Sequence, residues 1–248
     1  MMEYDSREWM KYMRRHTANV FNALFFDQES ISDDDIVSII ADVADFLFLP
    51  LPVISDKCET FAEILLREDA DKVELFYNIE MLRRDGINNK DAFTLCFVHE
   101  MAHQVLLTHQ FELFCNERWI QELAADLTAG LYAESHSLAT GKFMYALSRQ
   151  RYSITHPDGA LRKEIVEYGR SYLAHMSDDG EKLIQTVVKS MPAFVYTHYD
   201  ILQQDWDEAL SGFEGWPSKP RPIDIETLPD SNLIKQAVMK YKESSRKA

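Results

Sequence analysis

Two histidines and a glutamate have a spacing that suits a metal ion in the segment "FVHEMAHQVLLTHQF", residues 97–111. His99 and His103 are four residues apart, so on a helix they project side by side, offset by about 40° and one turn. Glu100 lies about 100° further round, where it can reach a water molecule held by the ion. Two ligands and one proton acceptor predict hydrolysis by a metal-activated water, with Glu100 as the general base.

Two residues compete for the third protein ligand that a catalytic zinc site needs. His109 would complete the pattern HExxHxxGxxH, but Leu106 stands where that pattern has its turning glycine, and a continued helix places His109 about 240° round from His103. Glu122 lies on a second predicted helix, with Asp126 four residues later on the same face. We favour Glu122 as the ligand and Asp126 as the acceptor of an imidazole N–H, because two histidines and a glutamate suit Zn²⁺.

The order of these motifs resembles a known family. HExxH followed by ExxxD is similar to the gluzincin metallopeptidases, and "THPDGALR", residues 155–162, resembles the THPxxxxR segment of HtpX-like peptidases. The similarity covers roughly residues 73–172. It implies that His156 lies at the active-site cleft, as an oxyanion stabiliser or as a fourth ligand of a latent state. Arg162 matches the arginine of that segment, so the resemblance implies that it supports the site; the other interpretation is that it pairs with a carboxylate and locks the fold.

Departures from the family pattern limit what the resemblance implies. The gap of 19 residues between His103 and Glu122 is shorter than is common in HtpX-like enzymes. The transmembrane segments of the membrane members are missing, so the expected protein is a soluble variant with a short gap between motifs. The flanks before residue 73 and after residue 172 match nothing in that family, so the resemblance implies no substrate.

Several other residues could be mistaken for parts of the site. Cys96 precedes His99 by one turn, but in so apolar a helix we expect it in the core. "SMPAFVY", residues 190–196, has a weak likeness to the methionine turn of HExxHxxGxxH enzymes, and Met191 is expected in the core. Weaker candidates for oxyanion stabilisation are Tyr152, Tyr196 and His198.

The elements that must position these residues are mostly helical, and the predicted fold class is α+β. Only 8 Gly and 8 Pro interrupt the long periodic segments. Ser32 and Asn89 are predicted helix caps. Helices are expected at 7–26, 33–48, 90–109, 117–134, 138–149, 157–174, 180–189 and 199–211.

A small sheet of two to four short strands should precede the HExxH helix. Two or three of these strands are expected between residues 53 and 80. We expect "KVELFYNIE", residues 72–80, to form the sheet edge that pairs with an extended peptide.

The predicted domain organisation is simple. Residues 1–214 should form a single zincin-like catalytic domain, with a helical part at 1–50, the metal-site core at 51–175 and a second helical part at 176–214. Residues 215–248 hold four of the eight prolines and should form a linker followed by a C-terminal helix.

The composition disfavours some classes of binding partner. A net charge of −15 disfavours nucleic acid and anionic lipid, and the longest apolar run, residues 46–54, is too short to span a bilayer. Three scattered cysteines and no visible signal peptide predict a reduced, cytoplasmic protein. The expected partner is a peptide or protein substrate.

The sequence therefore predicts a zinc-dependent metalloendopeptidase of gluzincin type. Two alternatives remain open. One is a regulatory protease similar to ImmA/IrrE that acts on one partner protein. The other is a zinc-stabilised interaction domain without catalysis.

Overall fold

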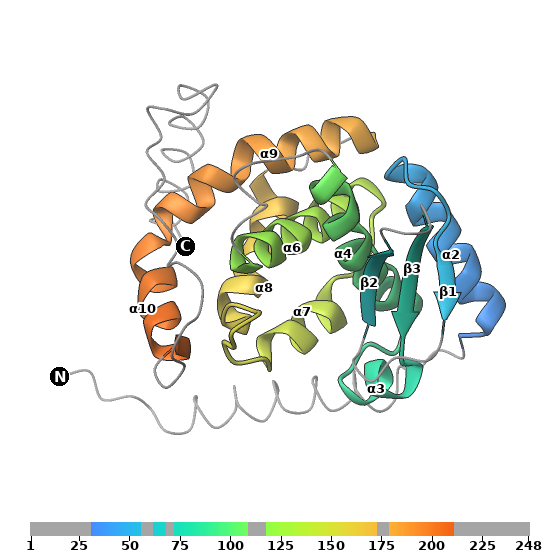
Figure 1. Cartoon of the computed structure of the whole chain (residues 1–248), viewed down its shortest axis with the longest axis horizontal. Helices are drawn as coiled ribbons and strands as arrows, with labels where there is room; N and C mark the ends of the chain where they lie inside the picture. Colours follow the sequence, from blue (N-terminus) through green and yellow to red (C-terminus); the bar gives the residue numbers. More distant parts are fainter. Residues whose placement is uncertain (1–30, 56–61, 68–71, 109–117, 173–178, 211–248) are drawn as a thin grey trace, which may run out of the picture.

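Two long helices, α4 (Lys90–Thr108) and α6 (Arg118–Ser135), form the centre of the protein. The computed structural model describes residues 31–55, 62–67, 72–108, 118–172 and 179–210. Within these ranges the chain is mainly helical with a small sheet, as the predicted α+β class requires (Figure 1). The predicted helix at 7–26, His109 and everything after residue 210 lie outside the described residues.

The remaining helices lie around this pair. On the α4 side are α2 (Asp33–Phe46), α3 (Ile79–Arg84) and the sheet. α7 (Gly141–Ser148) and α8 (Gly159–Tyr172) pack against the central pair and each other, and α9 (Gly180–Thr197) crosses α6 and continues into α10 (Tyr199–Leu210) (Figure 1). The HExxH and ExxxD motifs thus lie on two largely buried helices.

The sheet has three strands, β1 (Val53–Ser55), β2 (Ala62–Arg67) and β3 (Lys72–Tyr77), in the order β1-β3-β2. β1 is parallel to β3, and β2 is antiparallel to it, with Ile64 opposite Leu75. The prediction that residues 72–80 form the sheet edge is therefore wrong, because β3 is paired on both sides. The edge beside the metal-site motif is β2.

The predicted strand at 72–80 also ends early. Asn78 accepts a hydrogen bond from the backbone N–H of Met81 at 3.1 Å, and this cap begins α3 where the sequence suggested strand and loop. The two caps predicted elsewhere are present. Ser32 and Asp35 form a reciprocal capping box at α2, and Asn89 accepts from the N–H of Ala92 at 2.9 Å at the start of α4.

Helix α9 is longer than predicted. The expected end at residue 189 is wrong, because the helix continues through Pro192 to Thr197. Proline removes one helical hydrogen bond, but the surrounding turns bury Met191, Phe194 and Val195, and this packing sustains the helix. Residues 190–196 are therefore helical rather than a methionine turn, and Met191 is a core residue as predicted.

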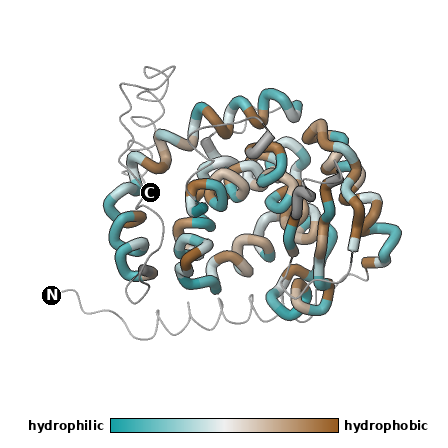
Figure 2. The backbone as a smooth tube through the Cα atoms, in the orientation of Figure 1, coloured by the Kyte–Doolittle hydropathy of each residue, from teal (hydrophilic) through white to brown (hydrophobic). Residues whose placement is uncertain are grey.

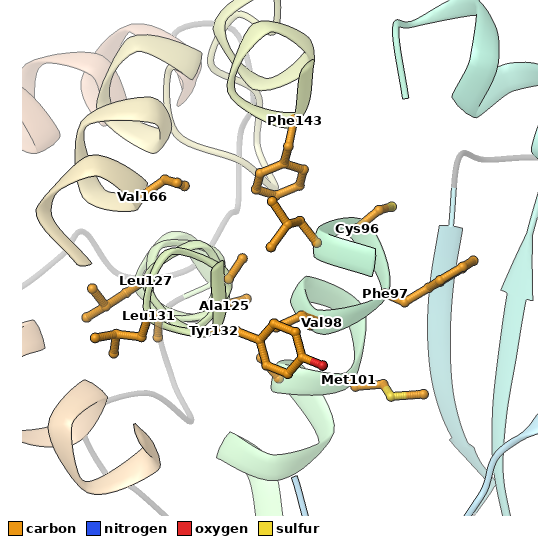
Figure 3. Packing of buried hydrophobic residues seen from close by; sticks show 14 of the residues in the cluster. Cys96, Phe97, Val98, Met101, Ala125, Leu127, Leu131, Tyr132, Phe143 and Val166 are labelled. Carbon is orange, nitrogen blue, oxygen red and sulfur yellow. The ribbon is translucent and has the colours of Figure 1, made fainter. Parts of the chain in front are cut away.

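The core is built on both faces of α4. Phe97 and Met101 point toward the strands, whereas Ala125 of α6 faces α4 from the other side (Figure 3). Leu127 and Leu131 point from α6 in the opposite direction, toward the outer helices (Figure 3). Small residues on α6 thus allow the two metal-site helices to approach closely.

Hydrophilic and hydrophobic residues alternate along the outer helices, which are typical amphipathic helices with one face on the core (Figure 2). Among the helices of the described ranges, none combines the length and the apolar character that a membrane span requires.

Candidate metal centre

Helix α4 places the two histidines of the HExxH motif next to each other. The Nε2 atoms of His99 and His103 are 3.3 Å apart, and the two rings meet edge to face with centroids 4.9 Å apart. His99 is buried and His103 partly buried. Two imidazole nitrogens at this separation can bind one ion, as their spacing of four residues predicts.

Helix α6 brings Glu122 to the same point. Its Oε2 lies 3.3 Å from His99 Nε2, and its Oε1 lies 3.6 Å from His103 Nε2. Donor atoms of His99, His103 and Glu122 all lie within 4.8 Å of one another, so this group could hold a metal ion. The structure thus places Glu122 where the favoured ligand set requires it.

The donor set fits a divalent cation. Glu122 Oε2 is buried without a hydrogen-bond partner among the described residues, although nitrogens of His99, His156 and Arg162 approach it within 3.5 Å. A buried carboxylate oxygen that lacks a hydrogen bond is costly. Coordination to an ion would satisfy it, and two imidazoles with one carboxylate are ligands that zinc uses.

Asp126 lies behind His99, as predicted. Its Oδ1 is 2.9 Å from His99 Nδ1, which directs the other ring nitrogen, Nε2, toward Glu122. A carboxylate in this position fixes the orientation and tautomer of a ligating imidazole. Asp126 is fully buried, so its charge needs a compensating cation.

Arg162 of α8 supplies that cation. Its Nε donates to Asp126 Oδ2 at 2.7 Å and its Nη2 donates to Asp126 Oδ1 at 3.1 Å. Nη1 donates to Gln150 Oε1 at 2.6 Å, and Nη2 also lies 3.5 Å from Glu122 Oε2. The guanidinium is itself buried. It therefore bridges the two carboxylates of α6, which is the carboxylate pairing expected of it.

Burial and neighbouring charges shift the pKa values of the three candidate ligands in different directions. Burial lowers the pKa of His99, but Asp126 and Glu122 outweigh it and raise that pKa to about 10. Burial lowers the pKa of His103 to about 4. Burial raises the pKa of the Glu122 carboxyl, but His99, His103 and Arg162 outweigh it and hold that pKa well below its usual range. The carboxylate and His103 are therefore ready to bind a cation at neutral pH, whereas His99 must first lose a proton.

Glu100 lines the same pocket as the three candidate ligands. Burial raises the pKa of its carboxyl to about 7, and the charges of Glu122 and Glu63 act in the same direction. A carboxylate whose pKa lies near the working pH is suited to accept and return a proton. Glu100 thus lies in one pocket with the candidate ligands, with a pKa close to neutrality.

His156 borders the three ligands from the loop between α7 and α8. Its Nε2 lies 3.3 Å from Glu122 Oε2, and its Nδ1 lies 2.7 Å from the Thr155 hydroxyl. Burial lowers the pKa of its ring. In the neutral tautomer with the proton on Nε2, the Thr155 hydroxyl donates to Nδ1 and the Nε2–H is directed toward the candidate ligands.

Ser153 and Trp119 hold this loop in place, and sequence reasoning missed both. The Ser153 hydroxyl accepts hydrogen bonds from the backbone N–H groups of Thr155 and His156, at 3.3 and 3.1 Å. The indole Nε1 of Trp119 donates to the Ser153 carbonyl at 3.0 Å and ties the loop to α6. The serine two residues before Thr155 was a signal for this turn, because serine side chains commonly bond to the backbone ahead of them.

A pocket of about 830 Å³ opens beside the candidate ligands. It is bounded by β2, α3, α4, α6 and α7 and by the loop that carries His156. The pocket is also lined by Gln150, Arg118 and Glu63. The sequence did not indicate these three residues, because only the folded chain brings them together. Such a volume is typical of sites that bind a sizeable ligand.

Of the remaining sequence candidates in the described residues, Cys96 borders the pocket and three others do not. Cys96 is buried, as predicted, and its side chain forms part of the pocket wall, where burial raises the pKa of the thiol. Tyr152 donates to Glu208 at 2.8 Å, His198 lies 3.1 Å from Glu164, and Tyr196 is exposed. Among the pocket-lining residues of the described ranges, none of these three occurs.

Comparisons with models of protein families, with curated proteins and with solved structures gave no match for this chain.

Proposed function

We propose that this protein is a zinc-dependent peptidase whose ion is held by His99, His103 and Glu122. One relationship carries the proposal. Three donor atoms that can share an ion lie in the same pocket as the carboxylate of Glu100. When bound, zinc would supply Lewis-acid activation of water and of the scissile carbonyl. The chain's own residues would perform the remaining tasks.

Glu100 would move the proton. Its carboxylate accepts a proton from the attacking water and returns it to the amine that leaves, so one residue acts first as base and then as acid. The raised pKa of Glu100, about 7, keeps both forms accessible near neutral pH. Bases of this kind contribute about 10²–10⁴-fold to a rate.

His156 would stabilise negative charge on the substrate oxygen. Its Nε2 atom lies 3.3 Å from Glu122 Oε2, so an Nε2–H would be directed toward the site. The Ser153 hydroxyl accepts a hydrogen bond from the backbone N–H of His156 and fixes the loop at this residue. A donor held in place before the reaction contributes more than one that must reorient. The positions of His156 and Arg162 beside Glu122 also support the HtpX-like resemblance at those two residues.

An open pocket favours catalysis over a purely structural ion. Structural zinc sites are closed by four protein ligands, whereas catalytic sites keep a position for water or substrate. Here three candidate ligands adjoin a pocket of about 830 Å³. The zinc-stabilised interaction domain is thus the less favoured alternative.

The test uses Glu100→Gln, which keeps the shape of the side chain and removes its basicity. The zinc-loaded variant should keep its metal content and its free energy of unfolding but lose peptide turnover by at least about a hundredfold. Glu134→Gln, an exposed change on α6, serves as the matched control. Full activity of Glu100→Gln, together with unfolding of His99→Ala, would instead indicate the structural role.

A further inference from the structure

The pocket extends beyond the candidate ligands into an apolar chamber. Helix α3 with the turn after it and helix α7 supply its walls, namely Met81, Leu82, Ile87, Phe143, Ala146 and Leu147. Cys96 of α4 also lines the pocket, one helical turn before His99, so the chamber begins about 5 Å along the helix from the first ligand. Side chains of the reacting part of a substrate would therefore reach it.

The chamber is apolar at its most buried points. Leu82, Ile87, Phe143 and Leu147 are buried, and Figure 3 shows Phe143 pointing from α7 toward the central helices near Cys96. An apolar side chain that enters such a chamber leaves water, which is favourable by about 25 cal/mol per Å² of apolar surface. A polar or charged side chain would lose its hydration there without a partner.

Two acidic residues on the β2 and α3 side line the same pocket. Glu63 is an exposed residue of the edge strand β2, and Asp85 ends α3. Strand β2 packs against the HExxH helix α4, and Glu63 and Glu100 line one pocket, so this part of the pocket adjoins the candidate site. A positive charge on a bound peptide would be attracted to this acidic rim, defined as Glu63 and Asp85.

We infer that the site takes peptides in which a large apolar side chain adjoins the cleaved bond and a lysine or arginine stands one or two residues away. This inference rests on the peptidase function proposed above and names its substrate class. The apolar chamber selects the first residue and the acidic rim selects the second. Peptides with a small residue at the cleavage point, or with acidic neighbours, should be poor substrates.

The experiment measures cleavage and binding separately. Three fluorescent decapeptides carry Phe-Lys, Ala-Lys or Phe-Glu at their centre and are otherwise identical. Zinc-loaded full-length protein gives kcat/KM and the cleavage position, and the Glu100→Gln variant gives the dissociation constant of each uncleaved peptide. The Phe-Lys peptide should exceed the Ala-Lys peptide by at least about tenfold and the Phe-Glu peptide by about fivefold in both measurements.

Three variants connect these preferences to the residues. Glu63→Lys should reverse the preference between the Phe-Lys and Phe-Glu peptides, and the effect should weaken at high salt. Ala146→Leu narrows the chamber and should reduce the advantage of the Phe-Lys over the Ala-Lys peptide. Glu80→Lys is the matched control, since Glu80 is an exposed acid of α3 outside the pocket lining, and it should leave all three peptides unchanged.

The outcomes separate this inference from the proposed function. Cleavage of all three peptides at similar rates would contradict the inferred substrate class but agree with the proposed peptidase function. Selective binding of the Phe-Lys peptide without cleavage of any would keep the substrate class and overturn the peptidase. A preference that Glu63→Lys leaves unchanged would overturn the assignment of the acidic rim.

Discussion

Arg162 and Asp126 are joined by two hydrogen bonds in the buried wall behind His99, with Nε 2.7 Å from Oδ2 and Nη2 3.1 Å from Oδ1. The same Oδ1 lies 2.9 Å from His99 Nδ1. One carboxylate therefore links a cation of α8 to a candidate metal ligand of α4. Stability and metal binding should both depend on this pair, and they can be measured separately.

Arg162→Met should lower the free energy of unfolding by about 3–5 kcal/mol, because it removes the buried guanidinium that forms two hydrogen bonds with the Asp126 carboxylate. Urea denaturation of the protein without added metal measures the change. Arg151→Met removes an exposed arginine from the preceding loop and should change stability by less than about 0.5 kcal/mol. Equal changes in the free energy of unfolding would show that the buried pair stabilises the protein no more than an exposed arginine does.

Asp126→Asn should weaken zinc binding by about 10–100-fold, because the amide no longer holds His99 in the ligating tautomer. Competition with a chromophoric chelator measures the affinity. Asp200→Asn alters an exposed aspartate at the start of α10 and should leave the affinity unchanged. An Asp126→Asn variant with the affinity of the unmodified protein would argue against the supporting role of Asp126.

Glu122→Ala should abolish stoichiometric metal content, whereas His109→Ala should retain it. Glu122 shares the site with both histidines, while Leu106 continues α4 instead of turning the chain. Native mass spectrometry of the purified variants gives the metal content directly. Loss of metal in the His109 variant alone would reverse the choice of the third ligand.

Zinc affinity of the metal-free protein should rise with pH. Burial opposes protonation of His99, but Asp126 and Glu122 raise its pKa to about 10, so at neutral pH the cation must displace one proton. The pKa of His103, about 4, means that this ligand is already neutral there. Affinity should therefore increase about tenfold per pH unit between about pH 6 and 8. Calorimetry in buffers of different ionisation enthalpy would detect the released proton, and a pH-independent affinity would contradict this titration.

Gly130→Ala should destabilise the protein by about 1–3 kcal/mol through overpacking. A Cβ at Gly130 would lie 2.3 Å from the Val166 carbonyl oxygen, so α6 and α8 would have to separate. Gly141→Ala is the control, because a Cβ there meets nothing within 4 Å. Thermal or urea unfolding compares the two. Similar stabilities would show that the contact between α6 and α8 can relax at little cost.

Local sequence signals predicted most of the secondary structure. Ser32 and Asn89 begin helices where their side chains suggested, and the strand region before α4 contains three strands. The missed helix α3 begins at a local cap, Asn78, whereas two other errors arose where longer-range contacts decide. Helix α9 was expected to end at residue 189, but its buried face maintains the helix through Pro192 to Thr197. The pairing order that makes β2 the edge has no signature in the strand sequences.

The candidate site was predictable to the extent that its residues share a helix. A spacing of four residues is sufficient to pair His99 with His103, and likewise Glu122 with Asp126. The meeting of the two helices at one point could be expected only from the known order of these motifs. Gln150 and Glu63 reach the pocket through contacts between distant segments, so no local pattern marked them.

The distance along the chain between Asp126 and Arg162, 36 residues, bears on how the protein is made. During synthesis the HExxH helix and the helix of Glu122 leave the ribosome before α8 exists. Until Arg162 emerges, docking these two helices would bury Asp126 without the guanidinium that forms two hydrogen bonds with it, which is unfavourable. We therefore expect the candidate metal ligands to be held firmly in their final positions only after translation has passed α8.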